Sequence, residues 1–139
     1  MTKMKYKIVE NSPFARIARL VLKSSNVAMV LGKTIHLSGV RRESFLKDSA
    51  WVAHELCHIR QFQEHGYLRF LWLYLRESMR VGYWNNKYEV EARLAGTKGR
   101  QEFLAELRKE TDAQLPAQPH SNIHPTGLPI PVDVKKKTI

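Results

Sequence analysis

The residues best suited to chemistry in this 139-residue chain lie in the segment AWVAHELCHIRQF, residues 50–62. The segment carries the frame H-E-x-x-H as His54, Glu55 and His58. An α-helix advances about 100° and 1.5 Å per residue, so the two histidines lie one turn apart on nearly the same face and can converge on one cation. The frame therefore predicts half of a zinc site; the alternative is a helix whose polar face happens to be rich in histidine.

Glu55 lies beside the histidines, close enough to reach a metal-bound water without ligating the metal. Metal-assisted hydrolysis needs this arrangement, because zinc lowers the pKa of bound water towards about 7 while a carboxylate accepts its proton. Glu55 is therefore the candidate catalytic base. Cys57 is the single cysteine, which excludes an internal disulfide and a multi-thiolate metal site, so we expect imidazole and carboxylate ligands and a buried packing role for Cys57 itself.

A third ligand is sought downstream, in the segment NNKYEVEARLAG, which contains Glu89 and Glu91. We expect this segment to be helical and to run beside the histidine helix. Two residues apart on a helix, the two carboxylates point about 200° away from each other. Only one can face the histidines, and the other should face solvent or hold a basic partner; geometry alone leaves the choice open.

Together, AHELCHIRQF and YEVEARLAG resemble the gluzincin metallopeptidases, and most of all their small bacterial members, the minigluzincin-like peptidases, over residues 27–96. The resemblance implies a zinc-dependent metalloendopeptidase that hydrolyses peptide bonds with zinc-activated water. It also implies His54, His58 and Glu89 as zinc ligands, because the ligand in related families is the first glutamate of an E-x-x-A-D run. This chain has Arg93 where those families often carry the aspartate.

Several further residues are candidates for roles near a metal. A hydrolytic site needs a donor for the developing oxyanion, and Tyr83 and Tyr88 are candidate transition-state stabilisers, with packing as the alternative. His36 is expected to be a strand histidine that is simply hydrogen-bonded at the surface; the alternative is that it lies on the strand that gluzincin-like proteins place along the edge of the site. His65 lies about two turns beyond His58, too far for the same ion, and is expected at the surface or in a helix cap.

The remaining pattern predicts small β elements followed by long helices. Ser12 and Pro13 are typical of a helix start, and Gly32-Lys33 of a hairpin between two β-rich runs. Gly96 and Gly99 weaken the middle of the last helix and suggest a kink or a break. The predicted elements are a strand in 5–9, a helix from Pro13, a hairpin in 27–37, a helix from Glu43 to Gly66, a helix from about 67 and a helix from about Asn86 to Glu110.

The segment YLRFLWLYLRESMRVGYW is unusually apolar on more than one side. One set of apolar residues falls at helical spacing and forms a stripe: Leu68, Leu71, Trp72, Leu75 and Met79. A second set lies on a different side of the helix: Phe70, Leu73 and Tyr74. We expect wide burial of this helix in the core, with a partner-facing patch as the alternative.

Composition divides the chain into one domain and a tail. Residues 1–110 are predicted to form an α+β, minimal zincin-like metallopeptidase domain, mostly helical with a small sheet or hairpin before the active-site helix. Residues 111–139 contain five of the six prolines and end in a lysine-rich run, which predicts a flexible tail. His120 and His124 in that tail share a four-residue spacing, but a helix among these prolines is not expected; a tail metal site or insertion into the cleft is the alternative.

Charge bears on partners and location. The formal net charge is +10, and residues 1–50 carry ten Lys or Arg against three Asp or Glu, which favours a solvated basic face or attraction to an anion such as nucleic acid, an acidic partner or a membrane surface. No signal-peptide pattern opens the chain and the longest apolar run contains Arg69, so we expect a cytoplasmic protein with no membrane span, acting on a peptide or protein. The alternatives are a non-catalytic, zinc-stabilised binding or structural protein and, less favoured, a nucleic-acid-associated protein.

Overall fold

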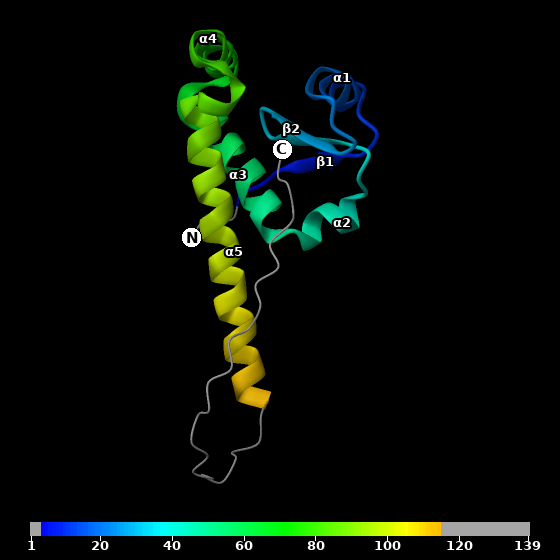
Figure 1. Ribbon diagram of the computed structural model, residues 1–139, viewed down its shortest axis with the longest axis vertical. Coiled ribbons are helices and arrows are strands. Elements are labelled where there is room, and N and C mark those ends of the chain that lie inside the picture. Colours follow the sequence, from blue (N-terminus) through cyan, green and yellow to red (C-terminus); the bar gives the residue numbers. More distant parts are fainter. Residues whose placement is uncertain (1–3, 115–139) are drawn as a thin grey trace, which may run out of the picture.

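The computed structural model describes residues 4–114, and the expected mostly helical α+β fold, with a small sheet ahead of the helices, is confirmed (Figure 1). The tail beyond Gln114, with His120 and His124, lies outside the described residues. In chain order the elements are β1 (Lys7–Val9), α1 (Pro13–Leu22), β2 (Val27–Leu31), β3 (Thr34–Ser38), α2 (Arg42–Lys47), α3 (Ser49–His65), α4 (Tyr67–Asn85) and α5 (Lys87–Gln114).

The sheet has the strand order β1-β3-β2, with β1 parallel and β2 antiparallel to β3. The predicted hairpin is confirmed, and Gly32 turns it with a φ of 65°, a conformation that suits glycine. One face of the sheet packs on α3 through a fully apolar cluster. This core contains Val30, Ile35, Leu37, Phe45, Ile59, Phe62, Phe70 and Tyr88.

His36 does not lie on an edge strand, because β3 is the central strand of the sheet. Its Nδ1 lies 2.8 Å from the Ser12 Oγ, and its ring packs edge-on to Phe14 at the start of α1, with 5.5 Å between ring centroids. The Ser12 hydroxyl therefore contacts His36 instead of capping α1. The expectation of a hydrogen-bonded strand histidine is confirmed, and the alternative that His36 lines the edge of the site is wrong; the edge strand on that side is β2.

The single helix expected from Glu43 to Gly66 is two helices, α2 and α3, separated at Asp48. Asp48 is extended (φ −93°, ψ 93°), and its side chain accepts a hydrogen bond of 3.0 Å from the Trp51 backbone N–H. An aspartate that caps a new helix satisfies a donor the helix cannot satisfy itself, which favours the break over continuation. The histidine helix thus has its own fixed beginning, and it ends at Gly66 as expected.

The α4 helix turns only one of its two apolar sides towards the core. Phe70 is buried and Tyr74 is partly buried, whereas the residues of the predicted stripe are mostly exposed. The exposed members are Leu68, Trp72, Leu75 and Met79. Wide burial of α4 was therefore the wrong expectation. Among residues 4–114, the helices all lack the combination of length and apolar character needed to cross a membrane.

The α5 helix crosses α3 at very short range and continues unbroken past Glu110 to Gln114 (Figure 1). A Cβ atom added to Gly96 would lie 2.8 Å from the Ala50 carbonyl oxygen, and one added to Gly99 would lie 2.5 Å from the Ala53 Cβ. The two glycines therefore let two helix backbones approach each other. The expected kink at these positions is absent from α5, because their role is close packing rather than helix breaking.

We predict that Gly99→Ala lowers the free energy of unfolding by about 1–3 kcal/mol, because the overpacked Cβ forces α5 away from α3 and this outweighs the roughly 1 kcal/mol that alanine contributes to helix propensity. Chemical denaturation of the two proteins measures the difference. Gln101→Ala, at an exposed position of the same helix, is the control and should change stability by less than about 0.5 kcal/mol.

The clash predicted at Gly99 involves one atom, so it has a direct rescue. Adding Ala53→Gly to Gly99→Ala removes the Cβ that the new methyl group meets. The double variant should regain most of the free energy of unfolding that Gly99→Ala loses, apart from the amount that a glycine at position 53 costs through its lower helix propensity. Additive destabilisation by the two changes would show that the approach of α3 and α5 at this point does not limit packing.

Candidate metal and catalytic site

His54, His58 and Glu89 converge from two helices that are packed directly against each other. The Nε2 atoms of His54 and His58 are 3.2 Å apart. The carboxylate of Glu89 reaches both rings, with 3.3 Å from Oε2 to the His54 Nε2 and 3.3 Å from Oε1 to the His58 Nε2. The three side chains form a group that could hold a metal ion.

The spacing of these donor atoms fits a small tetrahedral cation. Ligands bound at about 2.0–2.1 Å to the corners of a tetrahedron lie about 3.3–3.4 Å from one another. The two histidine nitrogens and the two Glu89 oxygens are separated by 3.2–3.3 Å in the three contacts between residues. Two imidazoles and one carboxylate also match the donor chemistry of catalytic zinc sites, which keep a fourth position open.

The tautomer of His58 is fixed by the amide of Gln61. The Gln61 Nε2 donates to the Tyr88 carbonyl oxygen at 3.1 Å and to Glu91 Oε2 at 2.9 Å. Its Oε1 must therefore accept from the His58 Nδ1–H, 2.9 Å away. This leaves the lone pair of Nε2 directed towards Glu89, the orientation that a metal-ligating histidine requires.

Glu89 is almost completely buried, at 3% exposed, yet it is only partly satisfied by hydrogen bonds. The Tyr74 hydroxyl donates to its Oε1 at 2.6 Å. Its Oε2 has no hydrogen-bond partner among the described residues, since the His54 ring lies 3.3 Å away without the alignment of a hydrogen bond. A buried carboxylate oxygen in this state is costly, and a cation beside it would remove the cost.

Electrostatics at the site favour an ionised Glu89. Burial alone would raise the pKa of Glu89, but the two histidine rings and the Tyr74 hydroxyl hold it well below its ordinary value. For His58, burial lowers the pKa, and the neighbouring Glu89 and Glu55 carboxylates outweigh burial and raise it. The pocket thus stabilises positive charge between the imidazoles and the carboxylate, in the form of a proton or a metal ion.

Glu91 points away from the histidines, as the helical geometry required of one of the two glutamates. Its carboxylate accepts from Arg60 at 2.6 Å and from the Gln61 amide at 2.9 Å. The expectation that the second glutamate holds a basic partner is confirmed. Glu91 therefore affects the site indirectly, because it holds the Gln61 amide that orients His58.

Glu55 lies on the wall of the site and outside the ligand group. It is 4% exposed, and the Trp51 indole N–H donates to its Oε1 at 3.2 Å. Burial raises the pKa of Glu55 above its ordinary value, while the charges of His58 and His54 oppose that change. A carboxylate that is oriented, buried and more basic than usual is suited to accept a proton near neutral pH.

The tyrosines are arranged differently from the sequence-based expectation. Tyr88 is buried in the core, with its ring edge-on to Phe70 at 5.0 Å between centroids, and it does not line the site. Tyr83 does line the site and is 45% exposed; burial and the charge of Glu89 raise its pKa, so the hydroxyl stays protonated. Tyr74, which sequence reasoning placed on an apolar surface, is the tyrosine bonded to Glu89.

Three other residues singled out in the sequence have structural roles. His65 ends α3 and stacks on Phe70, with 5.9 Å between centroids, away from the histidine pair. Cys57 is buried as expected, and burial raises the pKa of its thiol to about 11, so it is unreactive. Arg93 lies over the Trp84 ring at 4.2 Å and donates to the Trp84 carbonyl oxygen, so it secures the turn between α4 and α5.

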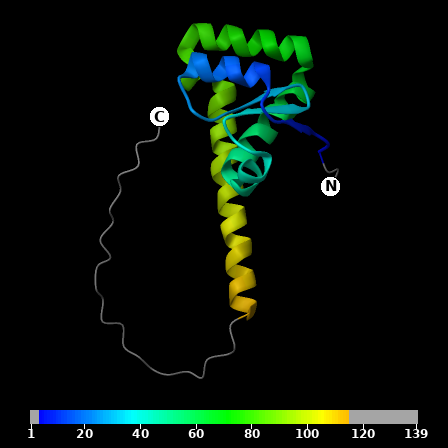
Figure 2. The same cartoon turned by 90° about the vertical axis from the view of Figure 1, so that its right-hand side faces the viewer.

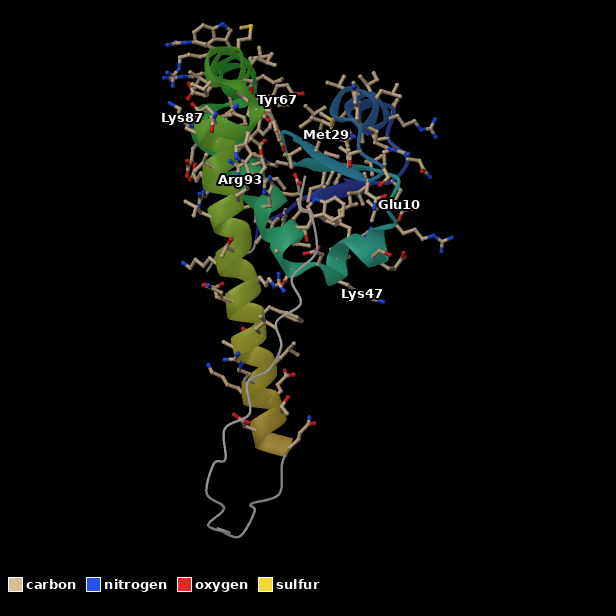
Figure 3. All side chains as sticks on the ribbon, in the orientation of Figure 1. Glu10, Met29, Lys47, Tyr67, Lys87 and Arg93 are labelled. Carbon is tan, nitrogen blue, oxygen red and sulfur yellow. The ribbon has the colours of Figure 1, made fainter. Side chains whose placement is uncertain are left out.

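A groove of about 450 Å³ leads to the ligand group. The walls are α1 and β2 on one side and α4 on the other, and side chains of α3 form the floor; in Figure 3, Met29 on β2 lies across from α4. The lining is predominantly apolar apart from the polar side chains around the site. Those are His54, Glu55, His58, Tyr74, Tyr83 and Glu89. The ligand group is therefore reached through a cleft of the size that binds small ligands or short chain segments.

No protein-family model matches this chain, and comparisons with curated proteins and with solved structures give no match.

The geometry predicts that the two glutamates of α5 differ sharply in metal binding. Glu89→Gln removes a ligand oxygen and should weaken zinc affinity by more than the roughly 10- to 100-fold that loss of an outer hydrogen-bond partner costs. Glu91→Gln keeps an oxygen that can accept from Gln61 and should change affinity only a few-fold. Competition with a chromophoric chelator measures both; the reverse order of effects would identify Glu91 as the ligand.

Proposed function

We propose that this protein is a zinc-dependent metallopeptidase of the gluzincin type, with His54, His58 and Glu89 as the zinc ligands. The observation that carries the proposal is the separation of roles at the site: donor atoms of three residues converge, while a second buried acidic residue, Glu55, lies beside them in the same groove. The segments HELCH and EVEARLAG, which resemble that family, supply these residues.

Zinc at this position supplies a Lewis acid that polarises a carbonyl group and makes water more acidic. Glu55 takes the proton from the attacking water and passes it to the leaving amine. Its position beside the ligand group, in the same groove, supports both halves of this task, because one carboxylate can receive the proton and then deliver it to the leaving nitrogen. The Trp51 indole N–H holds the Glu55 carboxylate in one orientation throughout.

The groove supports a peptide as the substrate. An extended segment fits along the wall formed by β2, an edge strand whose outer backbone groups are not paired within the three-stranded sheet. The apolar walls bury side chains of the substrate, and the exclusion of water strengthens the electrostatic effect of the polar groups at the end of the cleft. Tyr83, whose hydroxyl stays protonated, is the donor closest in character to an oxyanion stabiliser.

The central test is Glu55→Gln. The change is nearly isosteric and removes no ligand, so zinc content and fold should persist, whereas the rate of peptide cleavage should fall by about 10²- to 10⁴-fold. Cleavage of a diverse peptide library, followed by mass spectrometry with zinc measured in both proteins, gives the comparison. Equal cleavage by the two proteins would point to a contaminating protease and remove the proposal.

A non-catalytic role for the metal has a different signature. If zinc only fastens α3 to α5, chelation should lower the melting temperature while no peptide of the library is cleaved by the wild type. Spectroscopy of the cobalt-substituted protein separates the two cases further, since a site open to solvent changes its visible spectrum when a small anion is added and a closed site does not.

The two tyrosines proposed from the sequence give a second, matched test. Tyr83→Phe removes a hydroxyl that lines the groove and should lower kcat by roughly 10²-fold with little change in KM, if that hydroxyl donates to the developing oxyanion. Tyr88→Phe changes a buried residue that does not line the groove and serves as the control, with kcat within a few-fold of the wild type. Equal effects of the two changes would exclude the oxyanion role of Tyr83.

A further inference from the structure

Helix α4 carries a continuous stripe of large apolar side chains on the side that faces away from the core. Leu68 is 79% exposed, Trp72 59%, Leu75 56% and Met79 83%. Their spacing of four, three and four residues places them within a narrow sector of the helix surface, since each turn takes 3.6 residues. Exposed apolar residues are ordinary when scattered, but a contiguous stripe of this kind marks an interaction surface.

Helix α1 carries a second stripe of the same kind. Ile17 is 61% exposed, Leu20 79% and Val21 74%. Figures 1 and 2 show α1 and α4 at the same end of the molecule, opposite the protruding end of α5, and the two helices form the two walls of the groove. The two stripes therefore belong to one surface, here named the α1–α4 face. It consists of Ile17, Leu20, Val21, Leu68, Trp72, Leu75 and Met79, of which Ile17, Val21 and Leu75 also line the groove.

Basic side chains border this face on its outer sides. On α4, Leu71 lies beside the stripe on the side of the groove. Successive rotations of about 100° per residue place Arg69 and Arg76 on the other side of the stripe. On α1, the same rotations place Arg16 beside Leu20 and away from the groove, and Lys23 directly follows the last residue of the helix. All four of these basic residues are exposed. An apolar centre with cations along both borders complements a surface that is apolar inside and anionic at its edge.

Acidic side chains are scarce on the same two helices. Helix α1 contains none, and α4 contains one, Glu77, whose carboxylate pairs with Arg80 at 2.9 Å. Arg76 lies over the Trp72 ring, with 5.1 Å from its Cζ to the ring centroid. A tryptophan covered by an arginine at the border of an apolar stripe is a combination suited to the headgroup level of a bilayer, where an aromatic body and a cation are both stabilised.

We propose that the α1–α4 face docks the protein on the surface of an anionic lipid bilayer. The apolar stripes enter the boundary between headgroups and acyl chains, and the flanking arginine and lysine side chains contact lipid phosphates and carboxylates. The overall formal charge of +10 adds a longer-range attraction to the same surface. The proposal does not rest on the proposed function, because it involves neither the metal ligands nor Glu55.

The first experiment is co-sedimentation of the full chain with vesicles of phosphatidylcholine alone and of phosphatidylcholine mixed with phosphatidylserine. Binding should be strong only with the anionic vesicles and should weaken as salt is added. Replacing Arg16, Arg69 and Arg76 by glutamine should weaken binding by roughly fivefold for each charge removed. The matched control replaces Arg100, Arg108 and Lys109, three exposed basic residues of α5, and should weaken binding far less.

The contribution of the apolar side chains to vesicle binding is tested at exposed positions, where a substitution should change the stability of the fold little. Leu20→Gln, Leu68→Gln and Met79→Gln alter the three most exposed members of the α1–α4 face, and together they should reduce binding at least tenfold. The control changes Leu94, Leu104 and Leu107, which are exposed leucines of α5, to glutamine. Circular dichroism of both triple variants checks that the helices are retained.

The position of Trp72 gives a readout that protein partners cannot imitate. Lipids brominated on their acyl chains should quench the tryptophan fluorescence of the bound protein, and the quenching should be largely lost in Trp72→Phe and kept in Trp84→Phe. Failure of the wild type to bind anionic vesicles overturns the proposal, as does binding that is indifferent to the α1–α4 variants. Concentration-dependent dimerisation that the same variants abolish, without vesicle binding, would assign the face to a second copy of this chain.

Discussion

The close crossing of α3 and α5 is the contact on which the candidate site depends. Gly96 and Gly99 bring the backbone of α5 against Ala50 and Ala53, and this places Glu89, two to three turns earlier on α5, next to the histidine pair. A larger residue at either glycine would separate the helices by more than the tolerance of a metal site, whose ligands must lie within a few tenths of an ångström of their positions. Close packing of α5 on the first turns of α3 therefore positions the candidate ligands further along the same helix pair.

The packing of α3 against α5 also brings the titratable side chains of the site together. Four buried or half-buried titratable side chains, His54, Glu55, His58 and Glu89, share a small volume, and three of them are held by a group outside it. Trp51 orients Glu55, Gln61 orients His58, and Tyr74 donates to Glu89. These partners come from α3 and α4, so the arrangement persists only while both helices pack on α5. The cost of burying these groups is offset by mutual pairing, except at one Glu89 oxygen.

The apolar surface of α1 and α4 follows from the small size of the sheet. A three-stranded sheet and one crossing helix offer too little area to cover every apolar side of their neighbours, so α4 contributes Phe70 and Tyr74 to the interior and leaves its other stripe outside. The groove lies between α1 and β2 on one side and α4 on the other, with side chains of α3 as its floor. Access to the site and exposure of the two helices are thus consequences of the same limited core.

The sequence alone determined the local features, because these depend on spacing along one element: the hairpin at Gly32, the helix that pairs His54 with His58, and the rule that Glu89 and Glu91 face opposite ways. It could not determine which side of α4 is buried, since two apolar sides satisfy the same periodicity and only the position of the sheet chooses between them. It likewise gave no sign that Tyr74 rather than Tyr88 reaches Glu89, or that Asp48 divides a helix. Those outcomes depend on contacts between residues far apart in the chain, and these exist only once α3, α4 and α5 are packed together.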